Sequence, residues 1–496
     1  MQKLFPFILC FFTISFLSGY YNQDPVMISV SGAYNTLSSG YQCVGVNPGN
    51  LAFSKGVTMN LGQFNLNFKN NFITQKRLDD LKGANLEDPS SYNYYPKNKI
   101  LDYLKGEPIR NTLITNIPSS FLSFSYNSFA MTSEIKVFSD VELSQDFIKF
   151  VLYGNEIDST YNFFINSNSF IILESSVSKA YKVNNIGIGF TIKYLKGLVG
   201  YSYLTLENPE FITTATDINL SGSSYLLRQN TMGHGFGLDF GISTDRSSKG
   251  WKFGISFINV LSSVNWNHKT TIDKQMMDFY EDIYSQTELQ EKENKFLSLS
   301  IENLTVDDLN NDDVELSDLF VVNEVNMYEG SVLPQEYENL NYEFSTITNN
   351  YYIPSDSLCN NSSNPDCSVD LKLNQLEENI IKFDYPTMLS IGISKKINDR
   401  QLYMLDISTG LDDSFNNKEK WRVAVGGEFG TKVFPFRLGL SYGGYDKMSV
   451  GMGFGLHIPS NKGSFGIDFG ISYKGNIDVN SANGFDFGLG LYWTQN

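Results

Sequence analysis

Alternation of apolar and polar residues is the strongest regular pattern in this chain, and it is clearest near the C-terminus. In residues 436–442, for example, Phe436 and Leu438 alternate with Arg437 and Gly439. A period of two is that of a β-strand, in which successive side chains point to opposite faces of the sheet. The same pattern recurs in the runs 448–457, 465–473 and 485–493. Each run is close to the roughly 9–11 residues of a tilted strand that crosses a bilayer.

The two faces of these predicted strands differ in an unusual way. One face carries Phe, Ile, Leu and Met, whereas the other carries mostly Gly, Ser and Asp. Glycine is a poor strand former and gives a soluble core nothing to pack. An apolar outer face and a polar inner face are the arrangement of a transmembrane β-barrel. The alternative is a glycine-rich extracellular β-protein with its apolar face in a core.

Weaker runs of the same kind extend back to residue 57. The further predicted strands are 57–69, 119–128, 129–138, 169–181, 186–195, 236–242, 251–257, 386–395, 401–409 and 421–430. Connections between them alternate between short and long, and bacterial barrels have short periplasmic turns and long external loops. We therefore predict one closed antiparallel transmembrane barrel over residues 56–496, with partly helical external loops and both ends in the periplasm. The count is 14 strands, or 16 if residues 199–227 add a hairpin to the wall.

The N-terminus predicts export. Met1 to Lys3 form a short positive start, Leu4 to Leu17 are almost entirely apolar, and Gly19 is a small residue at a suitable cleavage point. The apolar run is too short to cross a bilayer as a helix, so residues 1–19 are interpreted as a secretory signal peptide. No later stretch is apolar enough for a membrane-spanning helix. The predicted location is the outer membrane of a Gram-negative bacterium, in contact with its lipid and lipopolysaccharide.

The acidity of the chain is confined to one segment. The net charge is -17, but residues 264–385 hold 25 of the 54 acidic residues and only 6 of the 37 basic ones. This segment is interpreted as an acidic external insertion, at which a protein partner is conceivable. Nucleic acid is not expected as a partner, because its phosphates repel an acidic surface.

The cysteines outside the signal peptide are Cys43, Cys359 and Cys367. Cys359 and Cys367 are close in sequence, and the predicted compartment is oxidising, so a local disulfide is expected between them. A ring this short would contribute roughly 2–3 kcal/mol at most. Cys43 is left without a partner, and we expect it to be a buried free thiol.

Motifs for catalysis or cofactor binding are not found in the sequence. The three histidines accompany no Ser or Cys nucleophile motif, and no metal-ligand spacing or phosphate-binding glycine loop is present. No enzyme, cofactor or metal site is therefore predicted. Asp239, Arg437, Asp468 and Asp486 fall on inward positions, where they could contact a cargo. The alternative, which we favour, is that they bond to one another and to the segment that fills the barrel.

Residues 20–55 do not have the pattern of a strand, and they carry a family resemblance. Small residues at 31–37 precede Asn47-Pro48-Gly49-Asn50-Leu51, directly before the first strand. This arrangement resembles the long-chain fatty-acid outer-membrane transporters and the related barrels that act as shuttles in type IX secretion. In those families the segment is a hatch that plugs the periplasmic side of the lumen.

A closer resemblance covers most of the chain and is to an uncharacterised family of outer-membrane barrels with the same hatch. It rests on the order of several motifs along the chain: Asp146-Phe147-Ile148-Lys149 with Tyr153-Gly154-Asn155, Gly235-x-Gly237-Leu238-Asp239, Tyr385-Pro386-Thr387 and the glycine-rich C-terminal strands. Two features depart from the family. Gly49 stands where Ala is usual, and the chain ends Trp493-Thr494-Gln495-Asn496 rather than on an aromatic residue.

The resemblance implies that residues 20–55 form a hatch, with Asn47, Pro48, Gly49 and Asn50 as candidate site residues. Its simplest alternative is a plain turn, in which Pro48 fixes one position and Gly49 supplies a positive φ. The resemblance further implies a passive conduit for small hydrophobic molecules. The competing hypotheses are a non-transporting scaffold or secretion-associated protein that presents the acidic insertion, and a hydrolase that brings Ser, His and an orienting group together.

Overall fold

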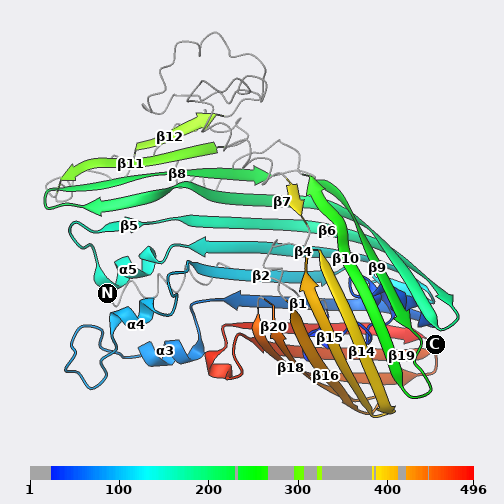
Figure 1. The fold of residues 1–496 in the computed structure, drawn as a ribbon. Coiled ribbons are helices and arrows are strands. Elements are labelled where there is room, and N and C mark those ends of the chain that lie inside the picture. The colour runs from blue at the N-terminus through cyan, green and yellow to red at the C-terminus, as the bar shows by residue number, and fades with distance from the viewer. Residues whose placement is uncertain are drawn as a thin grey trace, which may run out of the picture.

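Fourteen antiparallel strands close on themselves into a barrel (Figure 1). In this computed structural model, residues 24–229, 233–265, 295–305, 321–326, 382–384, 387–411, 421–444 and 446–495 are described. Strand β1 (Val57–Asn70) pairs with β20 (Gly484–Gln495) and so closes the wall. The strands between them are β2 (Ile109–Pro118) with β3 (Phe124–Tyr126), β4 (Phe129–Leu143), β6 (Ile165–Val183), β7 (Ile186–Thr213), β9 (His234–Thr244), β10 (Trp251–Asn265), β14 (Met388–Asn398), β15 (Gln401–Gly410), β16 (Arg422–Gly430), β17 (Pro435–Gly443), β18 (Lys447–Ser460) and β19 (Gly463–Lys474).

The wall has the predicted distribution of side chains. Outward-facing Phe240 and Leu440 are each 43% exposed, whereas the alternating Asp239 and Ser441 are buried. Burial of the polar face inside and exposure of the apolar face outside suit a wall surrounded by lipid. The sequence prediction of a 14-stranded barrel is confirmed. The signal peptide and the cysteine pair 359 and 367 lie outside the described residues.

The second wall strand was predicted in the wrong place. It is β2 with β3, and the predicted strand 119–128 covers only β3 and an irregular link. The link is held by backbone hydrogen bonds to Asn60 of β1. Asn60 N donates to Ser123 O, and Phe121 N donates to Asn60 O, each at 2.8 Å. Strand β1 therefore pairs with β2 from Asn70 to Asn65 and with β3 from Met59 to Val57. The ladder between the first two wall strands is interrupted at this point.

The alternative of 16 wall strands is wrong, because residues 199–227 form a branch outside the barrel. Strand β9 pairs directly with the first part of β7, so no hairpin lies between them. The rest of β7 pairs with β8 (Asp217–Gln229), β8 with β11 (Lys295–Thr305), and β11 with β12 (Val321–Asn326). These strands extend beyond the barrel in Figure 1. The short strands β5 (Thr160–Asn162) and β13 (Lys382–Asp384) pair with β7 and β10.

Helices occur in the long connections, as predicted. They are α3 (Gln75–Leu81), α4 (Lys97–Leu101) and α5 (Asp146–Tyr153), with the 3-10 turn η6 (Val479–Ser481) in the last long connection. In Figure 1 the three α-helices lie at the end of the barrel opposite the C-terminus. Among the described residues, no helix is long and apolar enough to span a membrane.

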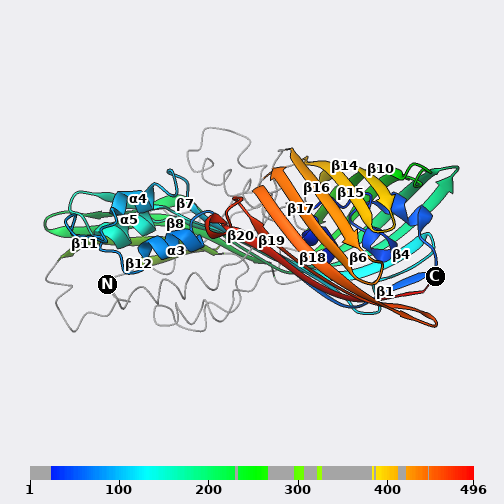
Figure 2. The same ribbon diagram turned by 90° about the horizontal axis from the view of Figure 1, so that it is seen from below.

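Residues 24–56, here called the N-terminal segment, lie inside the barrel. The segment contains α2 (Pro25–Ser29) and the 3-10 helices η1 (Gly40–Cys43) and η2 (Pro48–Phe53). Helix α2 contacts β17 to β20, whereas η2 contacts β6, β7, β9 and β10. Figure 2, seen from below, shows the dark-blue segment enclosed by strands from both sides of the wall. The arrangement places the segment in the lumen.

Candidate functional site

The start of the N-terminal segment is fixed by a helix cap. Asp24 accepts hydrogen bonds from the backbone N–H groups of Val26 and Met27 at 2.8 and 2.9 Å. Pro25 occupies the first turn of α2, where its missing N–H leaves no donor unsatisfied. Ser29 then donates to the backbone oxygen of Phe469 in β19 at 3.3 Å. Helix α2 is therefore tied to the C-terminal part of the wall.

The glycines of the inner wall make room for the N-terminal segment. A Cβ added at Gly439 would lie 2.1 Å from the Val30 carbonyl carbon, and one at Gly189 would lie 2.2 Å from that of Pro48. Such distances leave no space for any side chain, because both neighbours are backbone atoms. The glycine-rich face recognised in the sequence is thus a docking surface, on which the backbone of the segment lies directly against the backbone of the wall.

The Asn47–Asn50 motif begins η2 and is not the expected turn. Gly49 is not among the glycines with positive φ; instead, its added Cβ would lie 2.8 Å from the Gly241 carbonyl oxygen. Pro48 stands at the start of the helix, and the Asn47 side chain caps it by accepting from Gly49 N at 3.0 Å. Gly49 is therefore required for close packing on β9, and the alternative of a turn with a positive φ at Gly49 does not hold.

Two asparagines of the motif link the segment internally and to the wall. Asn47 Nδ2 donates to Asn35 Oδ1 at 2.8 Å and to the Ile242 oxygen at 3.3 Å. Asn50 Nδ2 donates to the Asn35 oxygen at 2.7 Å, and its Oδ1 accepts from Ser243 Oγ at 2.6 Å. The motif thus holds the middle of the segment against β9.

Two wall residues that the sequence analysis did not single out bind the segment most directly. Asp406 Oδ2 in β15 accepts from the backbone N–H groups of Tyr34 and Asn35 at 2.7 and 2.6 Å. Arg422 Nη2 in β16 donates to the Ser31 oxygen at 2.8 Å. Both occupy inward positions of strands with alternating burial, and this alternation was the only sequence signal for them. Sequence alone could not show which inward charges meet the segment.

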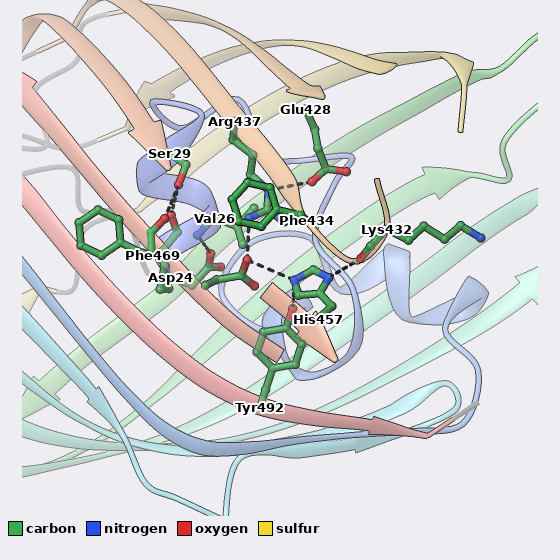
Figure 3. Close-up of polar contacts among 12 residues, drawn as sticks. Asp24, Val26, Ser29, Glu428, Lys432, Phe434, Arg437, His457, Phe469 and Tyr492 are labelled. Atoms are coloured by element: carbon green, nitrogen blue, oxygen red, sulfur yellow. Dashed lines mark hydrogen bonds and ion pairs between the residues drawn. The ribbon is translucent and has the colours of Figure 1, made fainter. Parts of the chain in front are cut away.

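Arg437 and Asp468 belong to one polar cluster near Asp24 (Figure 3). Arg437 donates to Asp468 Oδ1 and to Glu428 Oε2, each at 2.7 Å. His457 Nε2 lies 3.3 Å from the same Asp468 oxygen and 2.7 Å from the Tyr492 hydroxyl. His457 Nδ1 lies 3.0 Å from the Lys432 carbonyl oxygen, to which it can only donate.

The other two predicted lumen residues are also in ion pairs. Asp486 lies 2.8 Å from Lys474 Nζ and accepts from Ser472 Oγ at 2.8 Å. Asp239 lies 2.9 Å from Lys193 Nζ. All four predicted lumen residues are inward and bonded to neighbouring wall residues. Arg437 and Asp468 bond to each other, whereas Asp239 and Asp486 pair with the wall residues Lys193 and Lys474.

Part of the inner wall is apolar, which the sequence analysis did not anticipate. The cluster, here called the inner apolar patch, is fully or almost fully buried and consists of Ile114, Phe138, Phe170, Ile172, Leu195 and Val264. Phe138 faces inward because it alternates with the outward Val137 and shares its face with the buried Lys136. Lumen-facing positions are normally polar. The patch is therefore a packed apolar cluster on the inner face of this part of the wall.

Cys43 is a buried free thiol in the N-terminal segment, as expected. It packs with Val44, Leu51, Ala130 and Ala180. Burial raises the pKa of the Cys43 thiol to about 12, because the thiolate would lose its solvation. The thiol stays protonated at neutral pH, so Cys43 contributes packing and not reactivity.

Comparison with solved structures finds proteins of similar overall fold. The fold is similar to the toluene transporter TbuX of Ralstonia pickettii (12% identity, 97% of this chain and 99% of that chain, TM-score 0.46). It is also similar to the toluene transporter TodX of Pseudomonas putida (11% identity, 97% and 99%, TM-score 0.46) and to a FadL homologue of Pseudomonas aeruginosa (10% identity, 97% and 98%, TM-score 0.43). No protein-family model and no curated protein matches the sequence.

Proposed function

We propose that this chain is an outer-membrane conduit for small hydrophobic molecules, with the N-terminal segment as its hatch. The observation that carries this proposal is the inner apolar patch, because a lumen that served only hydrophilic solutes would not bury six apolar side chains on its inner face. The outer membrane of a Gram-negative bacterium is the proposed location. The barrel ends at Val57 and Gln495 then face the periplasm.

The proposed route passes the N-terminal segment on one side only. The segment is docked backbone to backbone on the glycines of β7, β9 and β17 to β19, which leaves no space there. Its opposite side, near η1, faces β1, β2 and β4, where a cavity remains and the β1 ladder is interrupted between Met59 and Asn65. We place the route along this second side.

Uptake by liposomes that contain the refolded barrel tests the proposal, with a panel of apolar and hydrophilic solutes measured against protein-free vesicles. The intact chain should admit apolar solutes selectively. Phe138→Asn should lower apolar uptake severalfold because it places an amide in the inner apolar patch, whereas the matched Phe138→Leu should retain it. Deletion of residues 20–55 should admit hydrophilic solutes as well. Absence of flux in both the intact and the deleted form would overturn the conduit.

A second candidate is a scaffold that binds a partner outside the cell. The branch of β7, β8, β11 and β12 favours it, because these strands carry the wall sheet into the acidic insertion 264–385. The liposome experiment separates the two candidates. A scaffold requires no flux in any form of the barrel, whereas a conduit requires selective flux in the intact one.

A further inference from the structure

The short turns between the wall strands carry mostly basic residues. In Figure 1 these turns gather at the end of the barrel that is marked by the C-terminus. The basic residues in or next to the turns are Lys182, Arg246, Lys249, Lys396, Arg400, Lys432 and Lys462. The acidic residues are Asp245 and Asp399, which are paired with Lys182 and Lys396, each at 2.6 Å. The other basic side chains of these turns form no ion pair with a described carboxylate, so this end of the barrel is positively charged.

Lys395 brings positive charge onto the lipid-facing surface close to these turns. It alternates in β14 with the buried Ser394 and shares the outward face with Ile397, which is 51% exposed. In the neighbouring strands it lies opposite Trp251 of β10 and Tyr403 of β15. The Lys395 ammonium nitrogen lies 4.8 Å from the centroid of the Trp251 ring, a distance at which the cation is attracted to the face of the ring. The lysine is therefore held within a row of aromatic side chains on the outside of the wall.

Lys179 has similar surroundings on another part of the wall. It shares the outward face of β6 with Tyr181, and its ammonium nitrogen lies 6.0 Å from the centroid of that ring. The residues opposite it are Phe129 in β4 and Phe190 in β7. Its ammonium group donates to Ser128 Oγ at 3.0 Å. Each of these two lysines is thus flanked by aromatic residues of both neighbouring strands.

The surroundings of the two lysines favour a lipid head group as the partner. Tryptophan and tyrosine side chains on the outside of a barrel mark the boundary between hydrocarbon and head groups. A lysine at this boundary lays its stem along the apolar wall and extends its ammonium group toward the head groups. A soluble partner would have to displace lipid to reach this face. An anionic head group suits the positive turns, whereas a zwitterionic one would bring its own cation close to them.

We propose that Lys395 and Lys179 each bind the phosphate of one anionic phospholipid. The ammonium group donates to the phosphate oxygens, and the aromatic neighbours hold it at the depth of the head groups. Tyr403, the cross-strand neighbour of Lys395, offers a further hydroxyl donor, as Ser128 does beside Lys179. The proposal rests on the wall being embedded in lipid and does not depend on the barrel being a conduit.

Native mass spectrometry of the full-length refolded barrel tests the proposal, with phosphatidylglycerol and phosphatidylcholine of identical acyl chains as probes. The wild type should bind two phosphatidylglycerol molecules about fivefold more tightly than phosphatidylcholine, because the two lipids differ in net charge. Lys395→Gln and Lys179→Gln should each lose one of these two lipids, and the double variant should lose the preference. Lys395→Arg should retain both lipids because it keeps the charge.

Lys462→Gln is the matched control, because it removes the same charge from the same end of the barrel, but from the turn between β18 and β19. It should change the lipid preference less than about twofold, since one distant exposed cation adds little to a local contact. Heat-modifiable migration of each variant on gels reports whether the barrel has folded. An equal loss of preference in folded Lys462→Gln and Lys395→Gln variants would overturn the two sites in favour of diffuse attraction by the turns. Equal binding of both lipids by the wild type would likewise overturn the proposal.

Discussion

At the scale of single residues, the Asp24 carboxylate is both the acceptor that caps α2 and a buried acid that burial disfavours in its charged form. It caps α2 as an acceptor, yet it is buried at 3% exposure in the lumen. Burial raises the pKa of Asp24 from 3.8 to about 6, although hydrogen bonds from Met27 N, the Tyr34 hydroxyl and Val26 N act in the opposite direction. The negative charge of Asp468 adds to the increase, and Glu134 faces Asp24 across the cavity. The docked carboxyl therefore takes up a proton more readily than a solvated one.

Docking of the N-terminal segment should depend on pH through this residue. The docked carboxyl has the higher pKa, so it holds a proton between about pH 4 and 6 that a solvated carboxyl has released. Docking should thus be tightest at and below about pH 4 and weaken as the pH rises from there through about 6. Hydrogen exchange or limited proteolysis of residues 24–56 at pH 5 and pH 8 measures this. Asp24→Asn keeps the cap without the titration, and a variant with the wild-type pH dependence would contradict the assignment.

Individual inward residues could be predicted, but their partners could not. Alternation alone placed Asp239, Arg437, Asp468 and Asp486 inside, since the side-chain period of a strand is two. The partners Lys193 and Lys474 depend on the register between strands, which the alternation within one strand does not contain. Asp406 was missed for a related reason: its contacts to Tyr34 and Asn35 join residues more than 370 positions apart.

At the scale of the elements, contact between the segment and the glycine face gives a sharp prediction. Gly189→Val should undock η2, because the first side-chain carbon already meets the Pro48 carbonyl at 2.2 Å and backbone cannot move aside cheaply. The wall of lipid-facing residues is untouched, so the barrel should still fold. Protease cleavage within residues 24–56 should rise at least tenfold while heat-modifiable migration stays normal.

Gly62→Val is the control for this variant. Gly62 lies in β1, and the nearest atom to an added Cβ is Leu491 Cδ1 at 4.0 Å. Cleavage of the segment should remain at the wild-type rate. Equal cleavage in the two variants would mean that the glycine face does not hold the segment.

Strands were predictable where the wall alternates strictly and failed where it does not. The C-terminal strands β17 to β20 have clean alternation because every second residue faces lipid. In β2 the inward positions include Ile114, which belongs to the inner apolar patch, so the contrast between faces is lost. Because of the interruption beside Asn60, the predicted strand 119–128 was placed after β2 instead of on it. The apolar inward residue and the interrupted pairing are thus the reasons why β2 was not recognised from the sequence.

At the scale of the whole molecule, the branch should be separable from the barrel. Removal of residues 200–229 leaves the pairing of β7 with β9 intact from Ile186–Thr244 to Lys196–His234. The shortened chain should therefore still give a folded, heat-modifiable barrel, with circular dichroism showing less β-structure. Loss of heat-modifiable migration would show that the branch is part of the closed wall after all.

The contacts of α2 have a consequence for the order of assembly. Ser29 bonds to Phe469 across 440 positions, and α2 packs against β17 to β20, the last strands to be made. The same region closes the wall, since β20 pairs with β1. Helix α2 can thus complete its contacts only when the final strands are in place. Docking of α2 therefore needs the same strands whose pairing closes the wall.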